Sequence, residues 1–225
     1  QQGEKIEIHE LPFLCSAALL TTEPEQFLLV TTQGVMLYDY RQQSYRLLCC
    51  WPEDHRTRPN EAAIAPDGSL WFSTMDKTAQ LAIGSWYRFT YGSVQAERML
   101  SGQHVPNTLV WHGKHAWFAD TFRHCFCRCD AQRISESTLH EWPIASLMAD
   151  GSALTHNGIL LNACWGSACI TAPSLNRQAV PSVGRIYTIS ISLQRLMGSS
   201  SLQTPKAHFC VIKPPTPDSE PRCSP

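Results

Sequence analysis

Four polar side chains occupy nearly the same place in successive stretches of the chain, six to eight residues before a turn glycine: Asn60, Glu61, Asn107 and Asp150. Taken alone, an Asn or Asp at such a place often bonds its own backbone at a turn or a strand entry. The shared place favours one common site instead. Two carboxylates buried together have a large desolvation free energy unless a cation is present, so the pattern indicates a metal ion or a basic partner.

The turn glycines define an internal repeat. Gly68, Gly113 and Gly158 follow one another at intervals of 45 residues, and each lies in a small-polar turn before an apolar or aromatic run. A weaker copy without the glycine covers residues 23–32. Asp-Gly and Asn-Gly turns flanked by runs rich in Val, Ile, Trp, Phe and Thr are typical of β-hairpins. No window in these stretches keeps an apolar stripe at helical spacing, so the repeat predicts strands.

A repeat of this length predicts a β-propeller, because four short strands fill a blade of ~40–50 residues. The 225 residues of the chain correspond to about five such units. In a propeller, equivalent positions of successive blades converge on the central channel. We therefore expect polar residues that lie about one repeat apart in the sequence to become neighbours in the fold.

Residues 171–225 depart from the repeat. They hold eight of the fifteen prolines and none of the seven tryptophans, and no turn with an aromatic run follows near position 203. Residues 184–193 have the composition of one strand, whereas 213–221 have that of a solvated extended segment. We therefore expect propeller blades over residues 1–170 and an atypical part over residues 171–225.

Composition narrows the class of protein. The formal net charge is −1 and no charge run occurs, which argues against nucleic acid and anionic membranes as partners. No stretch approaches the ~18 apolar residues of a membrane span. Ten cysteines in irregular positions favour a reducing, cytoplasmic location. The absence of a G-x-S-x-G motif argues against a serine hydrolase.

Cys125, Cys127 and Cys129 alternate with other residues, so on a strand all three thiols face one side. Such a row could bind a soft metal or undergo redox chemistry. Zinc sites, however, favour two to four residues between paired cysteines. Because a free cysteine also packs well as a small apolar residue, core packing is the favoured interpretation.

Several stretches resemble the regucalcin/gluconolactonase (senescence-marker-protein) family of six-bladed propellers. The family block R-x-N-D followed by P-D-G-x-x-W-x-G-T-M is similar to residues 58–61 and 66–75. Its G-x-L-Y-R strand is similar to residues 84–88, and its S-N-G-L-x-W strand to residues 106–111. Its block of P-D-G and A-x-W-G is similar to residues 149–151 and 163–166. Residues 9–12 are similar to its G-E-G-P. The match runs over about residues 5–170 in order, which implies an all-β, six-bladed type of propeller that is incomplete here, with about four to five blades.

The resemblance also implies a site. Glu10, Asn107 and Asp150 would be the ligands of one divalent cation, and Arg58 and Asn60 would contact the substrate. Two carboxylates and an amide oxygen are hard ligands, which suit Ca²⁺ best, with Mg²⁺ and Mn²⁺ as alternatives, and Zn²⁺ also binds carboxylates. Members of this family open sugar lactones.

By this resemblance the chain would be a divalent-metal-dependent hydrolase that acts on a small-molecule sugar lactone. The cation would polarise the lactone carbonyl and acidify a water, while Asp150 would take the proton as general base. Arg58 would hold the developing oxyanion. Two departures from the family pattern are Glu61 in place of Asp and Thr108 in place of Gly. The alternative is a catalytically inactive propeller remnant or binding module.

Overall fold

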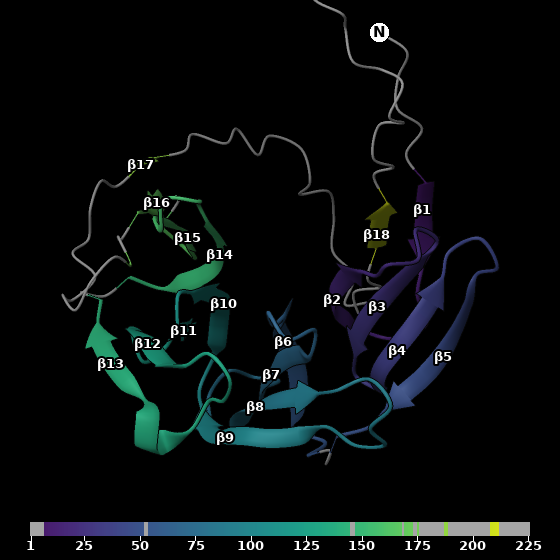
Figure 1. Ribbon diagram of the computed structural model, residues 1–225, viewed down its shortest axis with the longest axis horizontal. Helices are drawn as coiled ribbons and strands as arrows, with labels where there is room; N and C mark the ends of the chain where they lie inside the picture. The colour runs from purple at the N-terminus through teal and green to yellow at the C-terminus, as the bar shows by residue number, and fades with distance from the viewer. Residues whose placement is uncertain are drawn as a thin grey trace, which may run out of the picture.

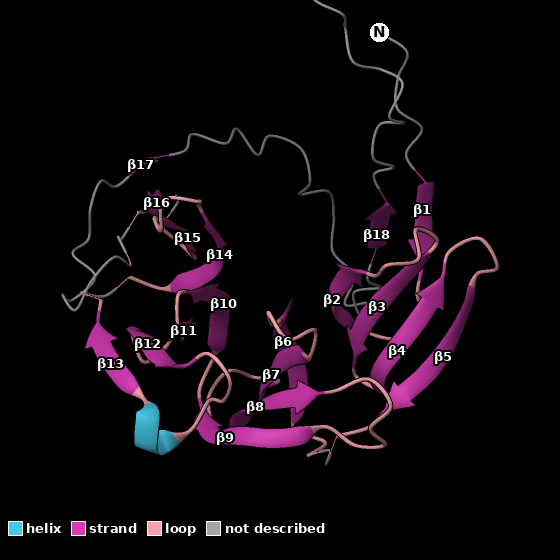
Figure 2. Ribbon diagram, viewed as in Figure 1, coloured by secondary structure: helices cyan, strands magenta, loops and turns pink. Residues whose placement is uncertain are grey.

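We describe the chain from a computed structural model, shown in Figure 1. The structure describes residues 7–51, 54–144, 147–167, 169–172 and 175, together with the strand residues 187–188 and 208–211. Strands dominate this part of the chain, as Figure 2 shows, and a single turn of 3₁₀ helix, η1 (Glu136–Thr138), joins two of them. The described residues therefore form an all-β protein, as the repeat predicts.

Sixteen consecutive strands form four antiparallel sheets of four strands each, in simple chain order. The first sheet consists of β2 (Cys15–Leu20), β3 (Gln26–Thr31), β4 (Gly34–Asp39) and β5 (Ser44–Cys49). The second consists of β6 (Thr57–Ile64), β7 (Leu70–Asp76), β8 (Gly84–Phe89) and β9 (Glu97–Gln103). The third consists of β10 (Pro106–His112), β11 (His115–Asp120), β12 (Cys125–Asp130) and β13 (His140–Pro143). The fourth consists of β14 (Ala149–Leu154), β15 (Leu160–Cys164), β16 (Cys169–Thr171) and β17 (Tyr187–Thr188).

The four sheets are blades of a β-propeller. Neighbouring sheets contact one another through their first strands, with β2 against β6, β6 against β10, and β10 against β14. In Figure 1 the sheets follow one another around a common centre, with these first strands innermost. The described sheets form an arc that does not close into a ring. The expectation of an incomplete propeller is therefore confirmed, with four blades described.

The turn glycines lie where the repeat predicts them, between the innermost and the second strand of a blade. Gly68, Gly113 and Gly158 have φ values of 82°, 60° and 74°, in the left-handed region that glycine adopts without a steric penalty. The weaker copy at residues 23–32 supplies the corresponding turn and strand β3 of the first blade. The interval of 45 residues is thus the interval between blades.

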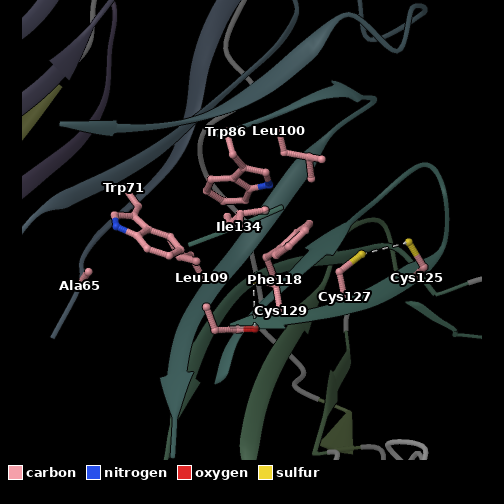
Figure 3. Close-up of a cluster of buried hydrophobic side chains, with 11 residues drawn as sticks. Ala65, Trp71, Trp86, Leu100, Leu109, Phe118, Cys125, Cys127, Cys129 and Ile134 are labelled. Atoms are coloured by element: carbon pink, nitrogen blue, oxygen red, sulfur yellow. Dashed lines mark hydrogen bonds between the residues drawn. The ribbon is translucent and has the colours of Figure 1, made fainter. Parts of the chain in front are cut away.

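The core consists of apolar layers between neighbouring blades, and Figure 3 shows the layer between the second and third. There Trp86 meets Phe118 edge to face, with ring centroids 5.3 Å apart. Cys125, Cys127 and Cys129 all lie buried in this layer, whereas Phe126 faces the fourth blade. Burial raises the pKa of the Cys129 thiol to about 12. The packing interpretation of the three cysteines therefore agrees with the structure.

Two described strands lie in the atypical C-terminal part. Strand β17 falls within the stretch 184–193 and completes the fourth blade against β16. Strand β18 (His208–Val211) pairs in antiparallel fashion with β1 (Glu7–Glu10), so the two ends of the described chain meet in a separate ribbon. The solvated segment expected at 213–221 lies outside the described residues. Within the described part of the chain, no helix has the length and apolar character to cross a membrane.

Candidate functional site at the inner strands

A β-bulge interrupts the pairing of each inner strand near its start. In the second blade the bulge lies between Pro59 and Ala62, and in the third between Asn107 and Leu109. In the fourth blade it lies between Ala149 and Ser152. A bulge bends a strand and turns its side chains away from the regular alternation. The four polar residues that mark the repeat in the sequence therefore lie at or beside these bulges.

These bulged strands surround a pocket of about 320 Å³. Its lining comes from the second, third and fourth blades: Arg58, Asn60, Met75, Ala79, Val105, Asn107, Thr121, Phe122, Asp150 and Trp165. Four of the five residues that the resemblance implies for the site are among them. The fifth, Glu10, is exposed on β1 and is not one of the lining residues.

Arg58, Asn60 and Asn107 form a continuous series of hydrogen bonds. The Arg58 guanidinium donates to Asn60 Oδ1 at 3.0 Å, and Asn60 Nδ2 donates to Asn107 Oδ1, also at 3.0 Å. Asn60 Nδ2 is also within 3.0 Å of the carbonyl oxygen of Pro106. Partial burial lowers the pKa of Arg58, which nevertheless stays cationic because an arginine pKa lies far above neutral pH. The series fixes a positive charge beside two amides from different blades.

Thr121 also lines the pocket, although it is not one of the polar residues that mark the inner strands of the repeat. Asn107 Nδ2 donates to Thr121 Oγ1 at 2.9 Å, and that hydroxyl donates to the carbonyl oxygen of Ala149 at 2.6 Å. The bond sets the orientation of the Asn107 amide and links the third blade to the strand that carries Asp150. The sequence does mark this position, because Thr121 belongs to the small-residue exit of its repeat.

Thr108 has a left-handed backbone, with φ of 53°, and is fully buried. This conformation explains why the family pattern has glycine here, since it is strained for a β-branched residue. The Thr108 hydroxyl donates to the carbonyl oxygen of Asp150 and accepts a bond of 3.0 Å from Asn162 Nδ2. Asn162 Nδ2 also lies 3.1 Å from that same carbonyl oxygen. Thr108 and Asn162 thus hold the main chain at Asp150.

Glu61, the fourth polar residue of the repeat, turns toward β10 and does not line the pocket. Its Oε1 accepts a bond of 2.9 Å from its neighbour Ala62 N–H, and its Oε2 accepts one of 3.2 Å from Thr108 N–H. Burial raises the pKa of Glu61, and the negative charge of Asp150 raises it further. The two departures from the family pattern, Glu61 and Thr108, therefore contact each other.

The oxygens that line the pocket fit a hard cation in part. Asn107 and Asp150 line the same pocket, and their side chains carry oxygen donors of the kind that Ca²⁺ prefers. Among the described residues, no three His, Cys, Asp or Glu side chains are grouped as a metal centre. Of the three cation ligands that the resemblance implies, Asn107 and Asp150 line the pocket, and Glu10 is not among the lining residues.

Fold and site together define a β-propeller with a polar pocket at its inner strands. Residues 1–183 match the family described as SMP-30/Gluconolactonase/LRE-like region, and the chain belongs to this family. The "Putative sugar lactone lactonase" of Rhizobium meliloti (strain 1021) is 26% identical over 178 residues, which are 76% of this chain and 59% of that protein. The family assignment made from the motifs is therefore confirmed.

Solved structures agree on the fold. Regucalcin, a calcium-binding protein from Agrobacterium tumefaciens str. C58, superposes with a TM-score of 0.70 at 22% identity, over 80% of this chain and 62% of that one. The luciferin-regenerating enzyme superposes with a TM-score of 0.69 at 20% identity, over 80% of this chain and 64% of that one. The chain spans less than two thirds of the length of each of these relatives.

Proposed function

We propose that this chain is a divalent-metal-dependent hydrolase that opens sugar lactones. One observation carries the proposal: Arg58, Asn60, Asn107 and Asp150, from three consecutive blades, line a single pocket. Membership of a family that includes gluconolactonases supports it, as does the likeness to a protein described as a sugar lactone lactonase.

Asn107 and Asp150 are the pocket residues that would hold the cation, and Glu10 is the third ligand that the family resemblance implies. Ca²⁺ is the preferred ion for such oxygen donors, with Mg²⁺, Mn²⁺ and Zn²⁺ as alternatives. A divalent cation bound there would supply Lewis acidity, which polarises a carbonyl group and makes a water molecule more acidic.

The side chains of the pocket have separate tasks in the reaction. The oxygen of a water molecule attacks the lactone carbonyl carbon, and the Asp150 carboxylate accepts the proton that this water loses. Arg58 donates hydrogen bonds to the carbonyl oxygen as negative charge develops on it. Asn60 holds the guanidinium in place through their bond of 3.0 Å. The ring C–O bond then breaks, the ring oxygen takes up a proton, and the product is an open-chain hydroxy acid.

The substrate that suits these groups is a hydroxylated five- or six-membered lactone such as an aldonolactone. A guanidinium and two amides offer hydrogen bonds to several oxygens, whereas an aliphatic ester has few oxygens to accept them. We further propose a cytoplasmic location, in keeping with the eight described cysteines, all of which are free thiols.

Proton release on adding gluconolactone tests the proposal, after correction for spontaneous opening. Replacing Arg58 by Ala removes an oxyanion donor, so we expect Arg58→Ala to lose about 2–4 kcal/mol of transition-state stabilisation, or ~30- to 1,000-fold in kcat/KM. Arg56→Ala is the matched control, because Arg56 is exposed and pairs with Asp54 outside the pocket. Equal rates for the two variants would contradict the role of Arg58.

A lactone-binding module without catalysis is the second candidate. The observation that favours it is the position of Glu10, which is exposed on β1 and absent from the pocket lining. Such a module would bind an aldonolactone saturably in calorimetry, but the lactone ring would still open only at its spontaneous rate. Saturable binding together with a rate above the background would exclude this candidate.

A further inference from the structure

Trp165 differs from the other tryptophans of the chain. All seven lie within the described residues, and six of them are buried or half-buried in the layers between blades. Trp165 is 59% exposed. Exposing an indole forgoes the favourable free energy of burying a large apolar surface, so an exposed indole in a pocket that also holds charged groups suggests a ligand contact.

The backbone around Trp165 is fixed, although its side chain is exposed. The main-chain N–H of Trp165 donates to the carbonyl oxygen of Met148 at 2.8 Å, and the next residue, Gly166, has a left-handed φ of 72°. Ser167 N–H then donates to the carbonyl oxygen of Cys164 at 3.2 Å, which closes the turn after β15. The indole is therefore presented from a defined turn of the fourth blade.

The lining of the pocket includes both polar and apolar side chains. Arg58, Asn60, Asn107 and Asp150 supply polar groups, and Met75, Val105, Phe122 and Trp165 supply apolar surface. The main chain at Val105, one of these apolar residues, is anchored by Asp120, whose carboxylate accepts bonds from His104 N–H at 2.8 Å and Val105 N–H at 3.1 Å. A ligand that fills the pocket would therefore meet hydrogen-bonding groups as well as apolar surface.

We propose that Trp165 is an aromatic platform for the ring of the substrate. The ring of a sugar lactone carries oxygens around its rim and C–H groups on its faces, so the indole would cover a C–H face while Arg58 and the amides bind oxygens. The inference rests on the proposed function and specifies it: the substrate is a cyclic polyol with an accessible C–H face. A contact of this kind acts on the bound substrate and the transition state alike, so it contributes to KM more than to kcat.

Steady-state hydrolysis of gluconolactone by the full chain is the first test. We expect Trp165→Ala to raise KM about five- to tenfold and to change kcat less than twofold, and Trp165→Phe to keep most of the affinity. The control is Tyr91→Ala, which removes another aromatic ring that is 76% exposed but lies outside this pocket. Since the Trp165 side chain is exposed, all three variants should melt at nearly the wild-type temperature.

The second test does not need activity. A cyclic polyol without a carbonyl group, 1,5-anhydro-D-glucitol, should change the tryptophan fluorescence of the wild type saturably and leave that of Trp165→Phe unchanged. If the wild type hydrolyses gluconolactone and Trp165→Ala has an unchanged KM, the platform is refuted while the lactonase proposal stands. If the polyol signal depends on Trp165 and no hydrolysis occurs, the platform stands and the lactonase proposal fails. If the wild type shows neither hydrolysis nor a fluorescence change with the polyol, both the platform and the lactonase proposal fail.

Discussion

The polar side chains of the pocket orient one another before any substrate is present. Asn60 accepts a bond from Arg58 and donates one to Asn107, so each amide has a defined orientation. Asn107 Nδ2 in turn donates to Thr121, while Asn107 Oδ1 accepts the bond from Asn60. A site that is ordered in advance loses less conformational entropy when it binds its ligand.

At the edge of the pocket, Asp76 holds the loop that carries Ala79. Its carboxylate accepts bonds from the Thr78 hydroxyl at 2.6 Å, Gln80 N–H at 2.9 Å and Leu81 N–H at 3.1 Å. These bonds lower the pKa of Asp76 from 3.8 to about 2, and the bond from the Thr78 hydroxyl has the largest effect.

The lowered pKa of Asp76 predicts an acid-sensitive contribution to stability. Because the folded state favours the charged form, the contribution is present above the ordinary pKa of 3.8 and is lost as the pH falls toward about 2. We expect Asp76→Ala to lower the urea midpoint most at about pH 7, with the difference from wild type shrinking on acidification. A difference that stays constant across that range would refute this assignment.

Residue identities at the site were predictable to the extent that they recur in the repeat. Asn60, Asn107 and Asp150 stand at equivalent places in their blades, and the structure brings all three to one pocket. Glu61 shares that place in the sequence but turns toward β10, because a bulge decides which of two adjacent residues faces the pocket. Thr121 and Trp165 instead follow the second strands of their blades, at the exit of the repeat, which marks their positions but does not identify them as residues of the pocket.

At the scale of elements, the bulge on β10 demands an unusual backbone from Thr108. A left-handed φ is costly for a β-branched residue, by about 1–3 kcal/mol, and the surrounding contacts must stabilise it. The bonds of its hydroxyl to Asp150 and Asn162 supply such contacts. The strain thus lies beside the proposed cation ligands.

The left-handed backbone of Thr108 predicts that, at this position, glycine gives a more stable protein than alanine, the reverse of the usual order. Both Thr108→Ala and Thr108→Gly lose the hydroxyl, but only glycine adopts the left-handed backbone without strain. We expect the glycine variant to be more stable than the alanine variant by about 1 kcal/mol in urea unfolding. At Thr57, on β6 and without a left-handed φ, the same pair of variants should rank in the ordinary order. If the glycine variant is less stable than the alanine variant at both Thr108 and Thr57, the backbone of Thr108 is not strained.

The hairpin turns were predictable because they depend on local sequence. Gly68, Gly113 and Gly158 each mark a turn whose left-handed φ favours glycine within that short segment. The bulges were not predictable in this way, because they depend on the register between two strands and on the packing of neighbouring blades. The pairing of β1 with β18 is less local still, since it joins residues from opposite ends of the chain.

At the scale of the whole molecule, the pocket exists only because blades pack side by side. Asn107 belongs to the third blade and Asp150 to the fourth, and the hydrogen bond from Thr121 to Ala149 links these two blades directly. An ion that binds both blades in the folded state and neither in the unfolded state stabilises the fold by mass action.

We therefore expect Ca²⁺ to raise the melting temperature. At about 100 times its Kd, a bound ion adds ~2.7 kcal/mol, which for a chain of this size corresponds to roughly 5–10 °C. Asp150→Asn should lose most of this shift, and Asp130→Asn, at the exposed end of β12, should keep it. If neither Ca²⁺ nor Zn²⁺, Mg²⁺ or Mn²⁺ moves the melt of the folded wild type, the pocket is not a cation site.

The rate of aldonolactone opening as a function of Ca²⁺ concentration is the most direct test of metal-dependent lactonase activity. Chelator-treated wild type should start at the spontaneous rate of proton release, and the rate should rise with added Ca²⁺ until it saturates. Asp150→Asn, folded to the same extent, should stay near the spontaneous rate at every Ca²⁺ concentration. A folded, Ca²⁺-loaded wild type that releases protons no faster than the uncatalysed reaction would contradict metal-dependent lactonase activity.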